Sequence, residues 1–349
     1  MATKAGHPPW PRPNEGDFII NDFPFSSGES LPELRLHYRT LGTPKRDKDG
    51  HALNAVLILH GTTGSSADFF RDIFAGELFG PGQLLSAQVY FLVLPDGIGH
   101  GGSSKPSDGL KARFPRYRYH DMVRAQHRLL TQHLDVDRLR LVMGTSMGGM
   151  HTWMWGTLFP DMMDALMPLA SLPVEIAGRN RMMRKLAIDS IRQDPAFHDG
   201  EYEVQPTGLR AALGVSAWMG STPLKWQQDA PDRASADAFI DAMVAKGMRE
   251  KDANDFAYAF EASLDYDPQP GLAGIQACLT AINFADDQVN PPELGILEEE
   301  TRRVPRGVAI VMPIDGTTAG HGTHSMAAVW NQYLAQLLDR SAPGASPHL

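Results

Sequence analysis

Short apolar runs that alternate with helical patterns constrain the fold of this chain more than any other feature. The runs, each bounded by Gly, Pro, Asp or polar residues, read LRLHY, AVLILHG, YFLVLPD, LRLVMG, ALMPLA, ACLTAINFAD and GVAIVMPI. Continuous apolar runs of this length are typical of strands that are buried on both faces. The pattern therefore predicts an α/β protein with a mostly parallel central sheet covered by helices.

The alternation stops between about Pro173 and Gly274. No strand-like run occurs there, and helical stretches follow one another: EIAGRNRMMRKLAIDSIRQD, ASADAFIDAMVAK and EKDANDFAYAFEASL. We expect a helical cap, residues 173–274, inserted into a core domain of residues 17–172 and 275–340. The Met and aromatic residues of the cap are expected to form its own core rather than a ligand site; they are Met182, Met183, Trp218, Met219, Phe256 and Phe260.

The composition argues against several classes of partner. A net charge of -9 leaves no basic stripe, so we expect neither nucleic acid nor an anionic membrane surface as a partner.

The single cysteine, Cys278, excludes an internal disulfide, and the start of the chain lacks the pattern of a signal peptide, which predicts a cytoplasmic location. Residues 1–16 and 341–349 are rich in Pro or small polar residues and are predicted to be flexible.

A Gly-x-Ser-x-Gly pattern indicates a nucleophile. Ser146 lies between Gly144 and Gly148, after the run LRLVMG and before the helical stretch HTWMWGTLF. A serine on a sharp strand-to-helix turn has a strained backbone, so the residues two positions away must be small. The pentapeptide alone also fits an ordinary tight turn, but its position between a strand and a helix favours the nucleophile elbow of the α/β-hydrolase fold.

A serine nucleophile needs a histidine base, and that base needs a carboxylate to fix its tautomer. In this fold the chain order is Ser, acid, His. Asp286 and Asp287 together end a predicted strand, and one of two adjacent carboxylates is expected to cap the turn. The pattern Asp287-x-Val289-x-Pro291 favours Asp287 as the acid and leaves Asp286 as the alternative.

Two histidines follow the last strand-like run. His321 comes directly after Gly320 in a loop, where the base of this fold lies, whereas His324 begins the final helical stretch and is expected to pack or cap there. A metal site of the two histidines lacks an acidic or cysteine ligand at a suitable spacing, so no metal is expected.

The oxyanion of an acyl-transfer reaction needs two N–H donors. The backbone N–H of Met147, next to Ser146, is one candidate. The other is expected in the loop His60-Gly61-Thr62-Thr63-Gly64, where we favour Thr62. This loop also reads as a plain glycine turn, so its assignment depends on Ser146.

With these residues in place, the chain resembles the homoserine O-acetyltransferases, a branch of the α/β-hydrolases with a helical cap. The resemblance covers roughly Leu34 to Leu338 and includes LHYRTLG, NAVLILHGTTG, DGIGHGGSSKPS, FPRYRYHDMVRAQHRLL, GTSMGGM with TLFPD, RQDPAFHDGEY with PTGL, the acid loop and GHGTH. It implies a triad of Ser146, Asp287 and His321, a ping-pong acyl-enzyme mechanism and a homodimer formed through the cap.

Two positions depart from that family where it holds the carboxylate and the amine of homoserine. The cap arginine is replaced by Leu213, and the aspartate after the histidine is replaced by Gly322. Leucine cannot imitate the two-point bond of a guanidinium, and nearby Arg210 points in another helical direction. Leu213 and Gly322 are therefore predicted to line a roomier, more apolar substrate site.

The sequence thus predicts a serine hydrolase that cleaves a small-molecule carboxylic ester without a cofactor. The alternative is a CoA-dependent O-acyltransferase with an acceptor other than homoserine, because both enzymes share the acyl-enzyme and differ in what removes the acyl group. A non-catalytic binding protein on the same scaffold is disfavoured, because such a protein would be expected to have lost part of the triad.

Overall fold

An eight-stranded sheet forms the centre of the molecule in a computed structural model that describes residues 10–342. Its strands are β1 (Asn14–Pro24), β2 (Ser30–Leu41), β3 (Ala55–Leu59), β4 (Phe91–Pro95), β5 (Leu141–Thr145), β6 (Ala165–Leu169), β7 (Cys278–Phe284) and β8 (Gly307–Met312). Their spatial order is β1-β2-β4-β3-β5-β6-β7-β8. The β1/β2 and β2/β4 pairs are antiparallel and all other pairs are parallel, so the predicted mostly parallel sheet is confirmed.

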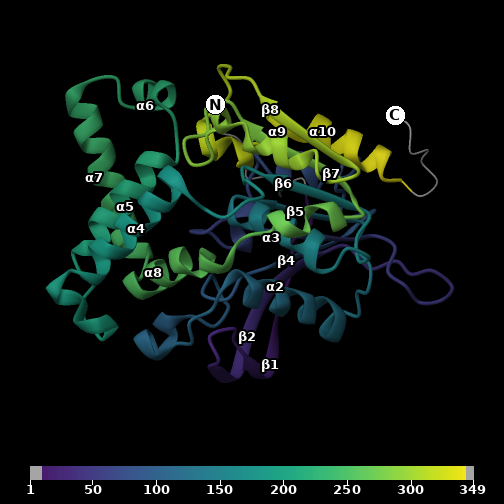
Figure 1. Ribbon diagram of the computed structural model, residues 1–349, viewed down its shortest axis with the longest axis horizontal. Coiled ribbons are helices and arrows are strands. Elements are labelled where there is room, and N and C mark those ends of the chain that lie inside the picture. The colour runs from purple at the N-terminus through teal and green to yellow at the C-terminus, as the bar shows by residue number, and fades with distance from the viewer. Residues whose placement is uncertain (1–9, 343–349) are drawn as a thin grey trace.

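Helices cover both faces of this sheet (Figure 1). They are α1 (Ala75–Leu78), α2 (Tyr119–Arg128), α3 (Met147–Leu158), α9 (Ile296–Thr301) and α10 (Ala327–Arg340). Val56 and Ile58 of β3 belong to the hydrophobic cluster that includes α1 and α10, whereas Leu57 and Leu59 belong to the cluster that includes α2, α3 and α9. Successive strand residues therefore face opposite, equally buried sides, which explains the continuous apolar runs.

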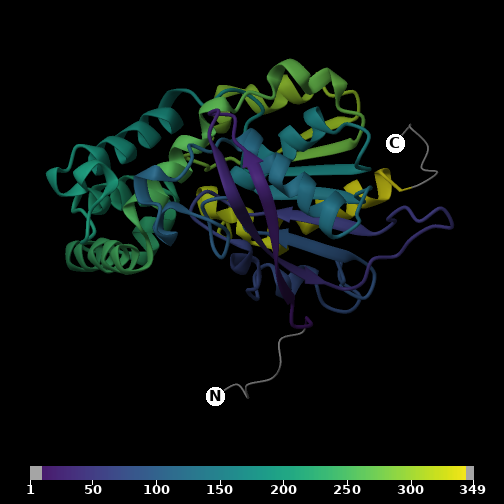
Figure 2. The ribbon, with the colours of Figure 1, turned by 90° about the horizontal axis from the view of Figure 1, so that it is seen from below.

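Between β6 and β7 the chain forms a group of helices, in the region where the sequence predicts an inserted helical cap, and we keep the name cap for this group. Its main helices are α4 (Gly178–Arg192), α5 (Gly208–Met219), α6 (Pro223–Asp229), α7 (Arg233–Glu250) and α8 (Ala253–Glu261). Figures 1 and 2 both place these helices together at one end of the molecule, beside the sheet.

The cap has its own hydrophobic cluster, which includes Met183, Met219, Phe256 and Phe260 as predicted. The prediction was wrong for Met182 and Trp218, which are 66% and 79% exposed. Their exposure follows from helical geometry, because the neighbours Met183 and Met219 face the cluster and adjacent residues point about 100° apart. The homodimer expected through the cap stays a prediction.

The N-terminal boundary differs from the predicted one. Strand β1 begins at Asn14 and Trp10 is buried, so the folded core starts before residue 17. At the other end Ser341 is also buried, and its hydroxyl accepts a hydrogen bond from Arg140 at 2.8 Å. The rest of the predicted flexible ends, residues 1–9 and 343–349, lies outside the described residues. No helix of residues 10–342 has the length and apolar character needed to cross a membrane.

Candidate active site

Ser146 occupies a strained turn between strand β5 and helix α3. Its φ of 55° and ψ of -114° lie outside the regions that residues with a side chain ordinarily adopt. A Cβ on Gly144 would lie 2.2 Å from the carbonyl oxygen of Gly148, and a Cβ on Gly148 would lie 1.9 Å from that of Leu59. Both neighbours must therefore be glycine for the serine to take this conformation.

Ser146, His321 and Asp287 form one hydrogen-bonded chain. The Nε2 atom of His321 lies 2.8 Å from Oγ of Ser146, and Nδ1 lies 2.9 Å from Oδ2 of Asp287. Asp287 Oδ1 accepts the backbone N–H groups of Val289 at 2.7 Å and Asn290 at 3.0 Å. Since a carboxylate can only accept, Nδ1 carries the proton and Nε2 is left to accept from the serine hydroxyl.

The environment of Asp287 keeps it ionised. Burial raises the pKa of this carboxyl group, but the interactions with His321 and the two backbone N–H groups lower it more, and the net pKa lies below the ordinary value. Asp286 is also buried, yet its Oδ1 has no hydrogen-bond partner within residues 10–342 and it makes no hydrogen bond to His321. The structure thus pairs Asp287, rather than the alternative Asp286, with the histidine.

His324 lies beside His321 without joining this chain. The two rings meet edge to face with centroids 5.1 Å apart, and Nδ1 of His324 lies 3.0 Å from the hydroxyl of Ser325. Burial, followed by the nearness of His321, lowers the pKa of His324 to about 3, so its ring is neutral at neutral pH. In the described part of the chain, no group of three or more His, Cys, Asp or Glu side chains is arranged to hold a metal ion.

The loop after β3 passes next to the serine. A Cβ on Gly61 would lie 3.5 Å from Cβ of Ser146, so the following residue, Thr62, is close to the place where an oxyanion would form. His100 also contacts this loop, because its Nε2 lies 2.7 Å from the carbonyl oxygen of Thr62. Met147 is the first residue of α3, where N–H groups have no partner inside the helix.

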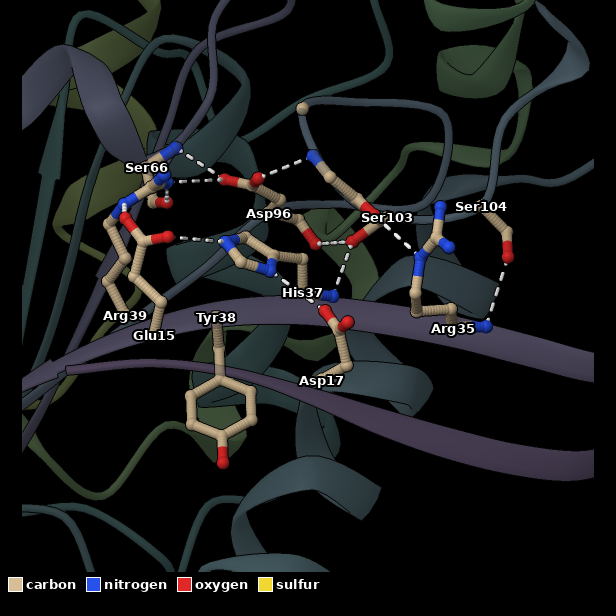
Figure 3. A network of polar contacts seen from close by, with 12 residues as sticks. Glu15, Asp17, Arg35, His37, Tyr38, Arg39, Ser66, Asp96, Ser103 and Ser104 are labelled. Atoms are coloured by element: carbon tan, nitrogen blue, oxygen red, sulfur yellow. Dashed lines mark hydrogen bonds and ion pairs between the residues drawn. The ribbon is translucent and has the colours of Figure 1, made fainter. Parts of the chain in front are cut away.

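Asp96, directly after β4, anchors the same loop (Figure 3). Its carboxylate is buried and accepts the backbone N–H of Ser66 at 2.7 Å and that of Gly102 at 2.8 Å. Arg39 of β2 donates to the Ser66 hydroxyl at 2.6 Å and to Glu15 of β1 at 2.9 Å. The two antiparallel strands therefore support the loop that carries Thr62, a role that no sequence motif indicated.

A cavity of about 440 Å³ lies between the core and the cap, and its lining includes Thr62, Ser146, His321 and His324. The cap contributes Met183, Arg184, Ser216, Ala217, Gly220 and Phe260 to the lining. Met183 and Phe260 therefore belong to the hydrophobic cluster of the cap and also face this cavity, so the expectation that they form core rather than a ligand site was only partly right. The structure therefore brings the predicted catalytic residues to a cavity large enough for a small molecule.

The predicted substrate-binding residues do not line this cavity. Leu213 packs against the hydrophobic cluster of the cap and lies beside Gly247 of α7, so the prediction for it was wrong. Gly322 lies next to the lining residue Gly220, and a Cβ on Gly322 would be 3.7 Å from the Gly220 carbonyl oxygen. Its backbone is near the cavity without forming the wall.

Arg184 is a lining residue that the sequence analysis did not single out. It belongs to the arginine-rich stretch GRNRMMRK of helix α4. Helical periodicity predicts the helix, but the packing of the cap on the core decides which of these arginines faces the cavity.

Comparison with known proteins agrees with this fold and these motifs. The family model described as the alpha/beta hydrolase fold matches residues 54–211. A homoserine O-acetyltransferase from Thermobifida fusca is 28% identical over 317 residues, which cover 80% of this chain and 80% of that protein.

Solved structures share the fold at lower sequence identity. The homoserine O-acetyltransferase from Bacillus anthracis has a TM-score of 0.81 at 21% identity, over 94% of this chain and 98% of the other. An acetylester hydrolase from Corynebacterium glutamicum has a TM-score of 0.79 at 22% identity, over 94% and 96%. The chain is therefore an α/β-hydrolase-fold protein related in sequence to the homoserine O-acetyltransferases, as its motifs indicated.

Proposed function

We propose that this protein is a serine hydrolase that cleaves a carboxylic ester through an acyl-enzyme. The observation that carries the proposal is the hydrogen-bonded chain from Ser146 through His321 to the ionised Asp287, at the wall of a cavity. Each member has the partner that its role in acyl transfer requires.

The proposed reaction has two stages. Nε2 of His321 takes the proton of Ser146 as Oγ attacks the ester carbonyl, and the N–H groups of Met147 and Thr62 stabilise the oxyanion. His321 then returns the proton to the alcohol that leaves, and Ser146 keeps the acyl group. In the second stage His321 takes a proton from water, which attacks the acyl carbonyl. His321 then gives this proton to Oγ of Ser146 as the bond between Oγ and the acyl group breaks, which releases the acid and restores the serine hydroxyl.

Acyl transfer is the second candidate, because the relatives include proteins named as acyltransferases. An amino-acid acceptor would need an anion to bind its ammonium group. Among the described residues that line the cavity, Asp68 carries the only carboxylate, and one of its two oxygens accepts the backbone N–H of Ser65 at 3.0 Å. This supports hydrolysis over transfer to an amino acid.

The test is to supply p-nitrophenyl acetate or acetyl-CoA, with and without excess homoserine, and to follow the acetyl group by mass spectrometry. We expect free acetate from p-nitrophenyl acetate in both cases and no product from the Ser146→Ala variant. O-acetylhomoserine as the main product would replace the hydrolase proposal by the transferase.

A further inference from the structure

Arg184 is a buried cation in the wall of the cavity that contains Ser146. It lies near the middle of cap helix α4, and only 3% of its surface is exposed. Arginine is almost never buried to this extent unless it is paired. The groups around Arg184 therefore show whether its charge is balanced within the protein or is available to a ligand.

All the observed partners of Arg184 are neutral. Nε donates to the side-chain oxygen of Asn180 at 3.0 Å, and Nη1 faces the hydroxyl of Ser263 at 3.2 Å and the carbonyl oxygen of Phe260 at 3.4 Å. The guanidinium also lies 5.4 Å from the centroid of the Phe260 ring. Within residues 10–342, no carboxylate forms an ion pair with Arg184, and its Nη2 has no hydrogen-bond partner.

A second arginine of helix α4 provides a comparison, because it forms an ion pair. Arg192, about two turns further on, donates to both carboxylate oxygens of Glu261, at 3.0 Å and 2.7 Å. Glu261 does not bond Arg184, although it belongs to α8, the helix that also carries Phe260. A buried charge without a counter-ion is unfavourable, so a ligand that supplies an anion is expected to bind strongly at Arg184.

The other charged residues of the cavity lining do not supply this anion. The carboxylate of Asp68 bonds the backbone N–H of Ser65, and Arg71 adds a further positive charge while its Nε bonds the carbonyl oxygen of Asp68. The cavity thus presents two guanidinium groups, of which Arg184 is the buried one.

We propose that Arg184 binds a carboxylate of the substrate and that the protein acts on esters that carry a carboxylate in addition to the scissile ester. This inference rests on the proposed ester hydrolysis. The free Nη2 donates to the carboxylate, while Nε and Nη1 stay fixed by Asn180 and Ser263. The carboxylate belongs to the acyl part or to the alcohol part of the ester, and the experiment separates these two arrangements.

Matched pairs of substrates test the proposal. Monophenyl succinate carries a carboxylate on the acyl part and phenyl succinamate is its neutral amide; 3-acetoxybenzoate carries one on the alcohol part and 3-acetoxybenzamide is its neutral amide. In the wild type we expect kcat/KM to be at least about tenfold higher for the anion than for the amide in one pair. That fold-change is the size of a charge-assisted hydrogen bond.

The ratio within the pair is the readout, because damage to the fold or to the triad lowers both values together. Arg184→Gln is expected to bring the ratio close to one, and Arg184→Lys is expected to keep part of it. Arg192→Gln, which removes the paired arginine, should leave the ratio as in the wild type. A ratio near one in the wild type, or a preference that survives Arg184→Gln, would overturn the proposal.

Binding to the Ser146→Ala variant separates this inference from the proposed reaction. Titration calorimetry with the same anions and amides should show the same preference, and Arg184→Gln in that background should remove it. A preference without any turnover by the wild type would support the carboxylate site and contradict ester hydrolysis. Turnover of p-nitrophenyl acetate by the wild type, without any preference for the anions, would support ester hydrolysis and contradict the carboxylate site.

Discussion

At the residue scale, the orientation of His321 depends on one of two adjacent carboxylates. Asp287→Asn should lower kcat for p-nitrophenyl acetate by about 10³ to 10⁴-fold, because an amide at this position no longer fixes the productive tautomer of the histidine. Asp286→Asn should lower kcat by less than about tenfold, because Asp286 makes no hydrogen bond to His321. Steady-state kinetics of the two variants gives the answer, and a reversed order would assign the acid to Asp286.

The same scale shows which site residues could be predicted from the sequence. Ser146 is identified by neighbours that must be glycine for steric reasons within five residues of chain. Asp287 and His321 could be predicted because each lies in a loop after a strand, and the order of the strands in the sheet determines which of these loops lie next to the serine. Leu213 was misplaced and Arg184 was missed, because the direction of a cap side chain depends on the packing of α4, α5 and α7 on one another and on the core.

At the scale of elements, the loop that carries Thr62 is held by the buried carboxylate of Asp96. Asp96→Asn should lower the free energy of unfolding by about 1–3 kcal/mol, because an amide oxygen accepts only one of the N–H groups of Ser66 and Gly102 well. Burial raises the pKa of Asp96, but His60 and these hydrogen bonds lower it more. Its contribution to stability is therefore present above the pKa of the unfolded state and is lost as the pH falls through the lower folded value.

Urea unfolding of the wild type and of Asp96→Asn at neutral pH checks this expectation. Asp17→Asn is the matched control, because Asp17 lies in the same network, bonds His37 at 2.8 Å and has a half-exposed side chain (Figure 3). It should change the free energy of unfolding by less than about 0.5 kcal/mol. Equal losses in the two variants would mean that Asp96 has no special part in holding the loop.

The elements themselves were predictable to different degrees. Strands β3 to β7 have continuous apolar sequences because both faces of the sheet are covered there, whereas the apolar edge strand β8 is only partly buried. Strand β1 was missed because it is an edge strand in which only Ile20 and Phe23 are buried and most other residues are exposed. Its support for the Asp96 network comes from Glu15, which a sequence alone gives no reason to connect with a loop near residue 66.

At the scale of the whole molecule, Asp255 joins the cap to the core. It lies on α8 and accepts both the backbone N–H of Ser107, at 2.9 Å, and the Ser107 hydroxyl, at 2.6 Å. Burial is the largest influence on this carboxyl group and raises its pKa from 3.8 to about 6, although the bonds from Ser107 act in the opposite direction. Because the folded state holds this proton more tightly than the unfolded state, the stabilisation from it is complete below about pH 3.8 and is lost as the pH rises through about 6.

Asp255→Asn should therefore gain stability relative to the wild type between pH 4 and pH 7, by at most about 3 kcal/mol for a pKa difference of about two units. The asparagine stays neutral and keeps an oxygen that accepts the Ser107 N–H. Urea unfolding at a series of pH values measures the difference between the two proteins, and Asp237→Asn, at an exposed position of α7, should show no such trend with pH. A stability difference that is the same at every pH would mean that the ionised carboxylate of Asp255 is as well accommodated at the junction of cap and core as the protonated one.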